Sequence, residues 1–235
     1  MSSRLAPPEV LSLNAREWLT PLTGIEAEHG EARLKRDTYA KGIYRMEGIG
    51  GYEYFHVRGP GRMPVTALQR REPTGQWKTW MVDDPLHWIG MRERVMDLPA
   101  GRLLVAGLGL GLFAHHLMER PDITQIDVVE IDADVIALIE PTLPDDPRRE
   151  LVHDDFYRYI AEPIIGLGID PVDPAWRAEQ EAHPRYDAVL WDLAVGGVDE
   201  TRGDFLTSLA EVLTWLPGAT LSQFGLRNNE RTILG

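Results

Sequence analysis

Short apolar runs alternate with helical patterns along the second half of the chain. The run at 103–106 is continuous, as expected for a strand that is buried on both faces of a sheet. Four further segments have strand character: 126–129, 151–152, 186–192 and 219–226. Apolar residues recur at helical spacing in the intervening segments 112–118, 133–143 and 205–216. This alternation of strands and helices predicts an α/β domain with a mostly parallel sheet.

The first third of the chain has a different pattern. Residues 42–82 contain short segments rich in aromatic and β-branched residues, separated by glycine or proline, which predict an antiparallel meander of three or four strands. Before them, segment 12–22 predicts a short helix capped by Ser12 or Asn14, and the charged run 26–37 is expected to be solvated surface. We therefore divide the chain into an N-terminal extension and meander, 1–83, and an α/β domain, 84–235.

Residues 161–185 interrupt the α/β pattern. This segment is rich in proline and is expected to be an irregular insertion. It would lie at the amino ends of the strands, away from the crevice where such sheets bind ligands. We expect it to contact a second subunit, in a homodimer, rather than a ligand.

A glycine turn follows the first strand of the α/β domain. Gly107, Gly109 and Gly111 stand at alternate positions, and a helix comes next. Glycines allow a tight turn and let a ligand approach the main chain, and the helix begins with N–H groups directed at that ligand. With Ala114 the turn fits G-x-G-x-x-A, which permits a dinucleotide. It also fits G-x-G-x-G, the form usual in S-adenosylmethionine (SAM) enzymes, so the turn alone leaves both ligands open.

Three acidic residues stand where successive strands end. Glu130 ends the second strand, Asp154 follows the third, and Asp192 ends the fourth. The carboxyl ends of parallel strands share one edge of the sheet, and ligands bind there. Glu130 can accept hydrogen bonds from a ribose diol, Asp154 can accept one from an adenine amino group, and Asp192 would face the reacting end of the ligand. Together they predict a nucleoside ligand.

The composition of the chain argues against several kinds of ligand, site and location. The chain has 235 residues and a formal net charge of −13, which should repel nucleic acid. It contains no cysteine, so disulfides and thiolate metal sites are excluded, and no His/Asp/Glu spacing suggests a metal site. No apolar run approaches the roughly 20 residues of a membrane span, and the polar start is unlike a signal peptide. We expect a cytoplasmic protein that binds a small molecule. His115 and His116 are expected on the helix surface.

The segments GLGLG, VVEID, HDDF and YDAVLWD together resemble the spermidine-synthase branch of the class I SAM-dependent methyltransferase fold. The resemblance covers roughly residues 42–225. It implies a Rossmann-like sheet preceded by a small β-meander, and SAM or decarboxylated SAM as the cofactor. The helix pattern DDPLHWIGMRERV before the first strand of the sheet also resembles that branch.

The resemblance also implies roles for individual residues. Asp192 matches the catalytic acid of the family, which orients an attacking amine and helps to deprotonate it. His87 and Asp84 would lie near the acceptor. The residues that would hold the nucleoside are Gly107, Gly109 and Gly111 around it, Glu130 at the ribose, and Asp154 at the adenine with Asp155 beside it.

Departures from the family pattern keep several functions open. Leu110 stands where aminopropyltransferases have an aspartate that holds the amine of decarboxylated SAM, and Leu86-His87-Trp88 replaces their Tyr-His-Glu. The first hypothesis is therefore a SAM-dependent methyltransferase that acts on a small or cationic acceptor. The second is a polyamine aminopropyltransferase (spermidine synthase), and the third is a non-catalytic nucleoside-binding or scaffold protein. A nicotinamide dehydrogenase ranks below these.

Overall fold

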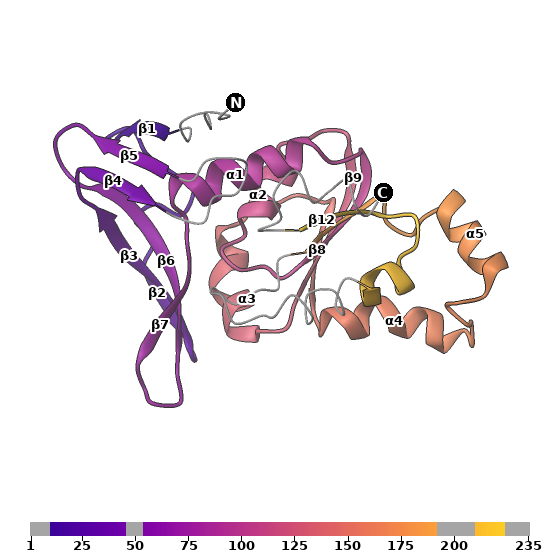
Figure 1. The fold of residues 1–235 in the computed structure, drawn as a ribbon. Helices are drawn as coiled ribbons and strands as arrows, with labels where there is room; N and C mark the ends of the chain where they lie inside the picture. The colour runs from indigo at the N-terminus through magenta and orange to yellow at the C-terminus, as the bar shows by residue number, and fades with distance from the viewer. Residues whose placement is uncertain (1–9, 46–53, 192–209, 224–235) are drawn as a thin grey trace, which may run out of the picture. The chain divides into compact units, whose positions relative to one another are not determined.

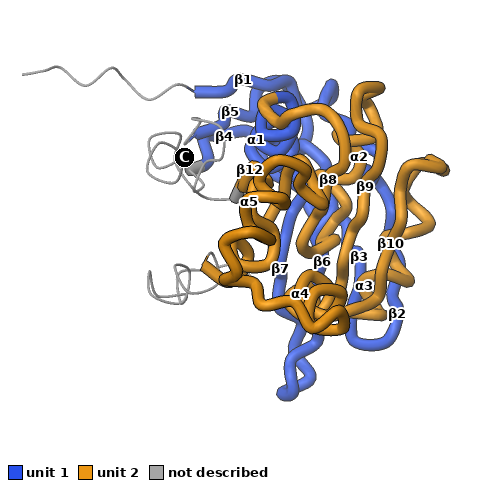
Figure 2. Tube along the Cα trace, turned by 90° about the vertical axis from the view of Figure 1, so that its right-hand side faces the viewer, with its two compact units in different colours: residues 1–96, 224–235 blue, residues 97–223 orange. Residues whose placement is uncertain are grey.

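The computed structural model describes residues 10–45, 54–191 and 210–223 (Figure 1). The chain divides into two compact units (Figure 2). Unit 1 comprises residues 1–96 and 224–235, and unit 2 comprises residues 97–223. Within the described ranges, no helix has both the length and the apolar composition that crossing a membrane requires.

Unit 2 is built on a parallel sheet of five strands. In chain order they are β8 (Gly101–Ala106), β9 (Ile123–Glu130), β10 (Arg149–His153), β11 (Ala188–Trp191) and β12 (Thr220–Gln223). Their order in the sheet is β10-β9-β8-β11-β12, and every neighbouring pair is parallel. The direction of winding therefore reverses between β8 and β11, which is the switch point of doubly wound sheets. The predicted α/β class with a parallel sheet is confirmed.

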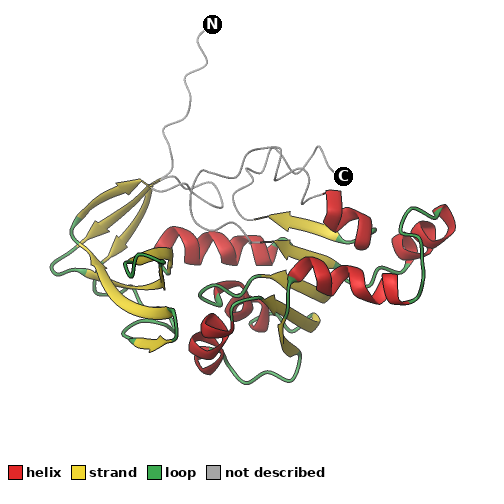
Figure 3. Cartoon of the chain, turned by 90° about the horizontal axis from the view of Figure 1, so that it is seen from below, coloured by secondary structure: helices red, strands yellow, loops and turns green. Residues whose placement is uncertain are grey.

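Helices connect these strands, as Figure 3 shows. They are α2 (Leu112–Met118), α3 (Ala133–Ile139) with the short 3₁₀ turn η1 (Glu140–Thr142), α4 (Phe156–Gly166), α5 (Pro174–Ala182) and a helical segment at 210–215. Leu104 and Val189 of the sheet pack with Phe156 and Ile160 of α4 and with Val212 in one buried cluster. Burial of these side chains holds α4 against the sheet.

The segment 161–185 is more regular than we predicted. Helix α4 continues to Gly166, and α5 spans Pro174–Ala182. The side chain of Asp173 caps α5 by accepting a hydrogen bond from the Ala175 N–H (2.8 Å), and Pro174 occupies the first helical position. These are ordinary helix-start signals. The prediction of an irregular insertion is therefore wrong for most of this segment.

In its described residues, 10–45 and 54–96, unit 1 contains two sheets and one helix. The three-stranded sheet has the order β1-β5-β4, and the antiparallel four-stranded sheet has the order β2-β3-β6-β7. The strands are β1 (Val10–Asn14), β2 (Ala27–His29), β3 (Ala32–Tyr39), β4 (Gly42–Arg45), β5 (Tyr54–Arg58), β6 (Met63–Arg71) and β7 (Trp77–Val82). Helix α1 spans Pro85–Met96. The predicted N-terminal β-meander is confirmed in outline, since β4 to β7 all lie within residues 42–82.

The structure corrects one prediction for the first 40 residues and extends another. The helix predicted over residues 12–22 is wrong at its start. Residues 10–14 form strand β1, which pairs in parallel with Tyr54–Arg58. The charged run 26–37 forms β2 and most of β3, and it is largely exposed, as predicted, except at Ala32 to Leu34. Ala32 and Leu34 alternate with charged residues and are almost fully buried. This period of two is the pattern of a strand with one face in the core.

A buried carboxyl group in unit 1 gives a testable pH dependence. Asp83 is fully buried and accepts hydrogen bonds from the Thr20 hydroxyl and the Thr66 N–H. Burial raises the pKa of Asp83 to about 6. Because this group keeps its proton longer in the folded state, the free energy of unfolding should fall by about 3 kcal/mol as the pH rises from about 4 to about 6.

The Asp83→Asn variant, which cannot titrate, should lack this loss. Thermal unfolding of both proteins from pH 4 to pH 7 measures the difference, and contributions from other groups cancel in the comparison. Equal pH dependence in the two proteins would mean that Asp83 titrates normally.

Candidate functional site

The glycine turn between β8 and α2 has the backbone that the sequence predicted. Gly107, Gly109 and Gly111 have φ values of 85°, 50° and 69°, a region that favours glycine. The Gly107 N–H donates to the Val129 carbonyl oxygen (2.9 Å), which ties the turn to β9. Gly107 and Gly109 are partly exposed, so a ligand can reach their main chain.

Gly111 has a second role in packing. It is buried directly before α2, where a Cβ would lie 2.8 Å from the Leu143 Cδ2 atom and 3.1 Å from the Ile139 Cγ2 atom. A larger residue there would have to push the Leu143 and Ile139 side chains aside. Gly111 therefore suits both the positive φ of the turn and the close packing of this position against Ile139 and Leu143.

Glu130 ends β9 and bonds directly to the glycine turn. Its Oε2 atom accepts a hydrogen bond from the Leu108 N–H (2.8 Å), and its Oε1 atom accepts one from the Asp132 N–H (2.8 Å). The residue is only 9% exposed. Each carboxylate oxygen has two acceptor positions, so Glu130 can hold the turn and still accept a further bond. The predicted contact with a ribose stays a prediction.

Asp154 and Asp155 follow β10 at the same edge of the sheet. The Asp154 N–H donates to the Glu130 carbonyl oxygen (3.1 Å), so the two acidic residues belong to neighbouring strand ends. Asp155 caps α4, since its Oδ1 atom accepts a hydrogen bond from the Arg158 N–H (3.0 Å). The Asp154 carboxylate pairs with the Arg158 guanidinium. Sequence reasoning missed Arg158, although its i,i+4 spacing from Asp154 at a helix start was a usable signal.

Asp192, the predicted catalytic acid, lies outside the described residues. It directly follows Trp191, the last residue of β11, and β11 pairs with β8. Its role stays a prediction. Unit 2 thus brings together the glycine turn, Glu130, Asp154 and Asp155, with Arg158 paired to Asp154.

Asp84 and His87 pair in unit 1. Asp84 is fully buried and caps α1, where its Oδ1 atom accepts hydrogen bonds from the Leu86 N–H (2.8 Å) and the His87 N–H (3.2 Å). Its Oδ2 atom lies 2.5 Å from the His87 Nδ1 atom. This contact fixes the orientation of the imidazole ring, as a carboxylate does for many functional histidines. The predicted place of the pair near an acceptor stays a prediction.

His115 and His116 are buried in α2, so the prediction that they lie on the helix surface is wrong. Burial, together with the neighbouring His116, lowers the pKa of His115 to about 4. The ring of His115 is therefore neutral near pH 7. These two histidines belong to the packing of unit 2.

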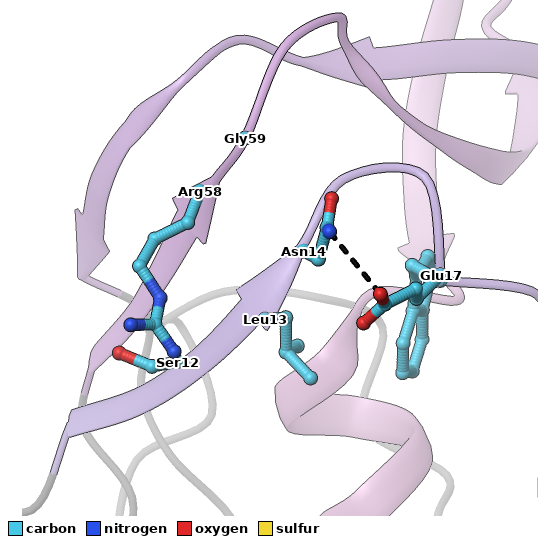
Figure 4. Close-up of a pocket in the computed structure, with 7 residues that line it drawn as sticks. Ser12, Leu13, Asn14, Glu17, Arg58 and Gly59 are labelled. Atoms are coloured by element: carbon cyan, nitrogen blue, oxygen red, sulfur yellow. Dashed lines mark hydrogen bonds between the residues drawn. The ribbon is translucent and has the colours of Figure 1, made fainter.

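Unit 1 also has a pocket of about 410 Å³ at its three-stranded sheet. Figure 4 shows Arg58 beside Ser12, and Glu17 beside Asn14. The Asn14 amide donates to the Glu17 carboxylate (3.2 Å). A Cβ at Gly59, where φ is +84°, would lie 2.6 Å from the Asn14 Oδ1 atom, so this glycine makes room for Asn14. None of the predicted site residues lines this pocket.

Comparison with known proteins adds two similar sequences, while no family model matches the chain. The chain is 32% identical over 129 residues to "Polyamine aminopropyltransferase 1" of Pseudomonas aeruginosa, covering 49% of this chain and 44% of that protein. It is 25% identical over 213 residues to "Polyamine aminopropyltransferase" of Aeropyrum pernix, covering 83% of this chain and 62% of that protein. The chain therefore spans less than two thirds of each of these relatives.

The solved structures that match the chain have low identity to it and low TM-scores. A spermidine synthase from Thermotoga maritima has a TM-score of 0.30 and 18% identity, covering 42% of this chain and 40% of that one. Human Methyltransferase-like protein 13, in complex with SAH, has a TM-score of 0.34 and 23% identity, covering 58% and 59%. The two sequence relatives are thus both named polyamine aminopropyltransferases, while the two solved structures are a spermidine synthase and a methyltransferase-like protein.

Proposed function

We propose that the chain is a transferase that binds SAM at the carboxyl edge of the sheet in unit 2 and transfers its methyl group to a small or cationic acceptor. One observation carries this proposal. A nearly buried carboxylate, Glu130, ends β9 and bonds to the backbone of a turn whose three glycines have positive φ. Such a turn and carboxylate are suited to hold the ribose of a nucleoside.

The residues present fit an adenosyl group. The partly exposed backbone of Gly107 and Gly109 leaves room for close approach, and Glu130 and Asp154 offer acceptors to the ribose hydroxyls and the adenine amino group. SAM, when bound, supplies an electrophilic methyl group on a sulfonium centre. Transfer to an aligned nucleophile depends mainly on positioning. Asp192 would orient the acceptor and take up its proton as a general base.

Charge supports a cationic acceptor. Residues 97–223 contain 24 aspartates and glutamates against 8 lysines and arginines. An excess of one sign raises the local concentration of ligands of the opposite sign. The chain as a whole carries −13, so unit 2 holds the entire acidic excess and the rest of the chain is slightly basic.

A polyamine aminopropyltransferase is the second candidate, because both curated relatives carry that name. It would use decarboxylated SAM as the donor. Against it, Leu110 in the glycine turn is fully buried and provides no carboxylate for the ammonium group of decarboxylated SAM. We therefore rank methyl transfer first.

The test is to incubate the purified chain with SAM or with decarboxylated SAM, each with a panel of amines that includes putrescine. We expect S-adenosylhomocysteine from SAM, and loss of most of this product in Asp192→Asn. Methylthioadenosine from decarboxylated SAM would instead establish aminopropyl transfer. Tight binding of SAM without either product would indicate a non-catalytic nucleoside-binding protein, and no binding would contradict the proposal.

A further inference from the structure

The hydrogen-bond donors that reach the Asp154 carboxylate all converge on one of its two oxygens. The Asp155 N–H and the Arg158 Nε atom each lie 2.6 Å from Oδ1, and the Arg158 Nη2 atom donates to the same oxygen. Among the described residues, no donor bonds to Oδ2. The carboxylate is planar, so holding Oδ1 on one side fixes the direction in which Oδ2 is presented.

The backbone that carries these donors belongs to a firmly packed part of unit 2, while the Arg158 side chain is 58% exposed. Helix α4 is anchored by Phe156 and Ile160, which are 3% and 0% exposed. The Asp154 N–H is bonded to the Glu130 carbonyl oxygen, so the backbone of Asp154 is fixed to the end of β9. Arg158 reaches back over the first turn of α4 to Asp154, at the i,i+4 spacing of helical side-chain pairs. The bonds from Arg158 therefore restrict the rotation of the Asp154 side chain, whose backbone is already fixed.

A fixed carboxylate oxygen can discriminate between purine bases. An ionised carboxylate only accepts hydrogen bonds, so it binds the 6-amino group of adenine and repels the 6-oxo group of hypoxanthine. A carboxylate free to rotate, or one that turns both oxygens toward Arg158, would discriminate less.

We propose that Arg158 is a positioning residue that fixes the Asp154 Oδ2 atom as the acceptor for the 6-amino group of adenine, and so makes this site select adenine over 6-oxopurines. The inference rests on the proposed function, because it presupposes a nucleoside beside Glu130. Arg158 acts through Asp154 and need not touch the ligand.

The probes are S-adenosylhomocysteine and S-inosylhomocysteine, which differ in the 6-amino and 6-oxo groups. Calorimetry on the full chain should give the adenine compound about tenfold tighter binding, the size of one net hydrogen bond. In Arg158→Ala this ratio should fall to about twofold, because Asp154 loses two of its three donors. Glu162→Gln is the matched control, since Glu162 lies 4.0 Å from the Arg158 Nε atom and has no bond to Asp154. Its ratio should stay near ten.

Asp154→Asn gives a sharper second test. If its oxygen stays on the donors from Asp155 and Arg158, its Nδ2 group takes the place of Oδ2 and presents N–H donors. The preference should then reverse, with S-inosylhomocysteine bound more tightly. Adding Arg158→Ala should abolish the reversal, because the amide loses its orientation. A purely structural role for Arg158 would change the stability of the chain without changing these ratios.

The outcomes separate this inference from the proposed function. Failure of the unmodified chain to bind either compound would contradict both. Equal binding of the two compounds by the unmodified chain would overturn the inference alone. An unchanged ratio in Arg158→Ala would do the same, as would the absence of reversal in a folded Asp154→Asn variant. Thermal unfolding of each variant confirms that it is folded.

Discussion

Glu130→Ala should weaken the binding of S-adenosylhomocysteine about 100-fold. If Glu130 holds the ribose as proposed, the substitution removes two charge-assisted hydrogen bonds to it, each worth about 1.5 kcal/mol. It also removes the acceptor for the Leu108 N–H, so the glycine turn loses its bond to the end of β9. Calorimetry with the purified variant measures the change. The affinity of Glu130→Gln should lie between those of the unmodified chain and Glu130→Ala. One amide oxygen cannot accept hydrogen bonds from both the Leu108 and the Asp132 N–H groups.

Glu150→Ala is the matched control for this substitution. Glu150 lies on the neighbouring strand β10, is exposed, and carries the same charge. Its removal changes the net charge of unit 2 equally but leaves the glycine turn intact. Binding should therefore stay within about twofold of the unmodified chain. Equal weakening by both substitutions would mean that general charge, rather than the position of Glu130, governs binding.

Gly101→Ala should destabilise the fold by about 3 kcal/mol. Gly101 starts β8 with φ at +110°, a conformation that costs an L-residue about 1–2 kcal/mol. A Cβ there would also overlap the Asp187 carboxylate, with the Asp187 Cγ atom only 2.8 Å away. That carboxylate accepts a hydrogen bond from the Arg102 N–H (2.7 Å), so it cannot move aside without losing this bond. The midpoint of thermal unfolding should fall by about 6–12 °C.

Gly168→Ala separates backbone strain from the steric overlap. Gly168 lies in the same unit with φ at +69°, and no atom lies within 4 Å of the place a Cβ would occupy. This variant should lose only the strain, about 1 kcal/mol. If the two variants lose equal stability, the contact between Gly101 and Asp187 has no energetic importance.

The sheet of unit 2 was predictable because each of its strands is short, apolar and followed by a clear break. The run at Leu103–Ala106 is buried on both faces, and such strands need no alternation to be recognised. Strand β3 was missed because Arg33, Lys35 and Arg36 dominate its composition, which conceals the alternating Ala32 and Leu34. Strand β1 was missed because its partner β5 lies about 40 residues further along the chain.

The shared edge of Glu130 and Asp154 could be predicted from the sequence, but the hydrogen bonds of their side chains could not. Glu130 and Asp154 were found because acidic residues that end parallel strands must share one edge of the sheet. The hydrogen bond from the Leu108 N–H to Glu130 depends on how the glycine turn folds against β9, which no local pattern encodes. The burial of His115 and His116 likewise depends on what packs around α2, since all of its residues except Met118 are buried.

The central claim is that the glycine turn and Glu130 hold an adenosine. A crystal structure of the chain soaked with S-adenosylhomocysteine tests it most directly. The account predicts the ribose hydroxyls within hydrogen-bond distance of the Glu130 carboxylate and the adenine amino group at Asp154. A ligand bound elsewhere on the chain, or a ribose with no contact to Glu130, would contradict it.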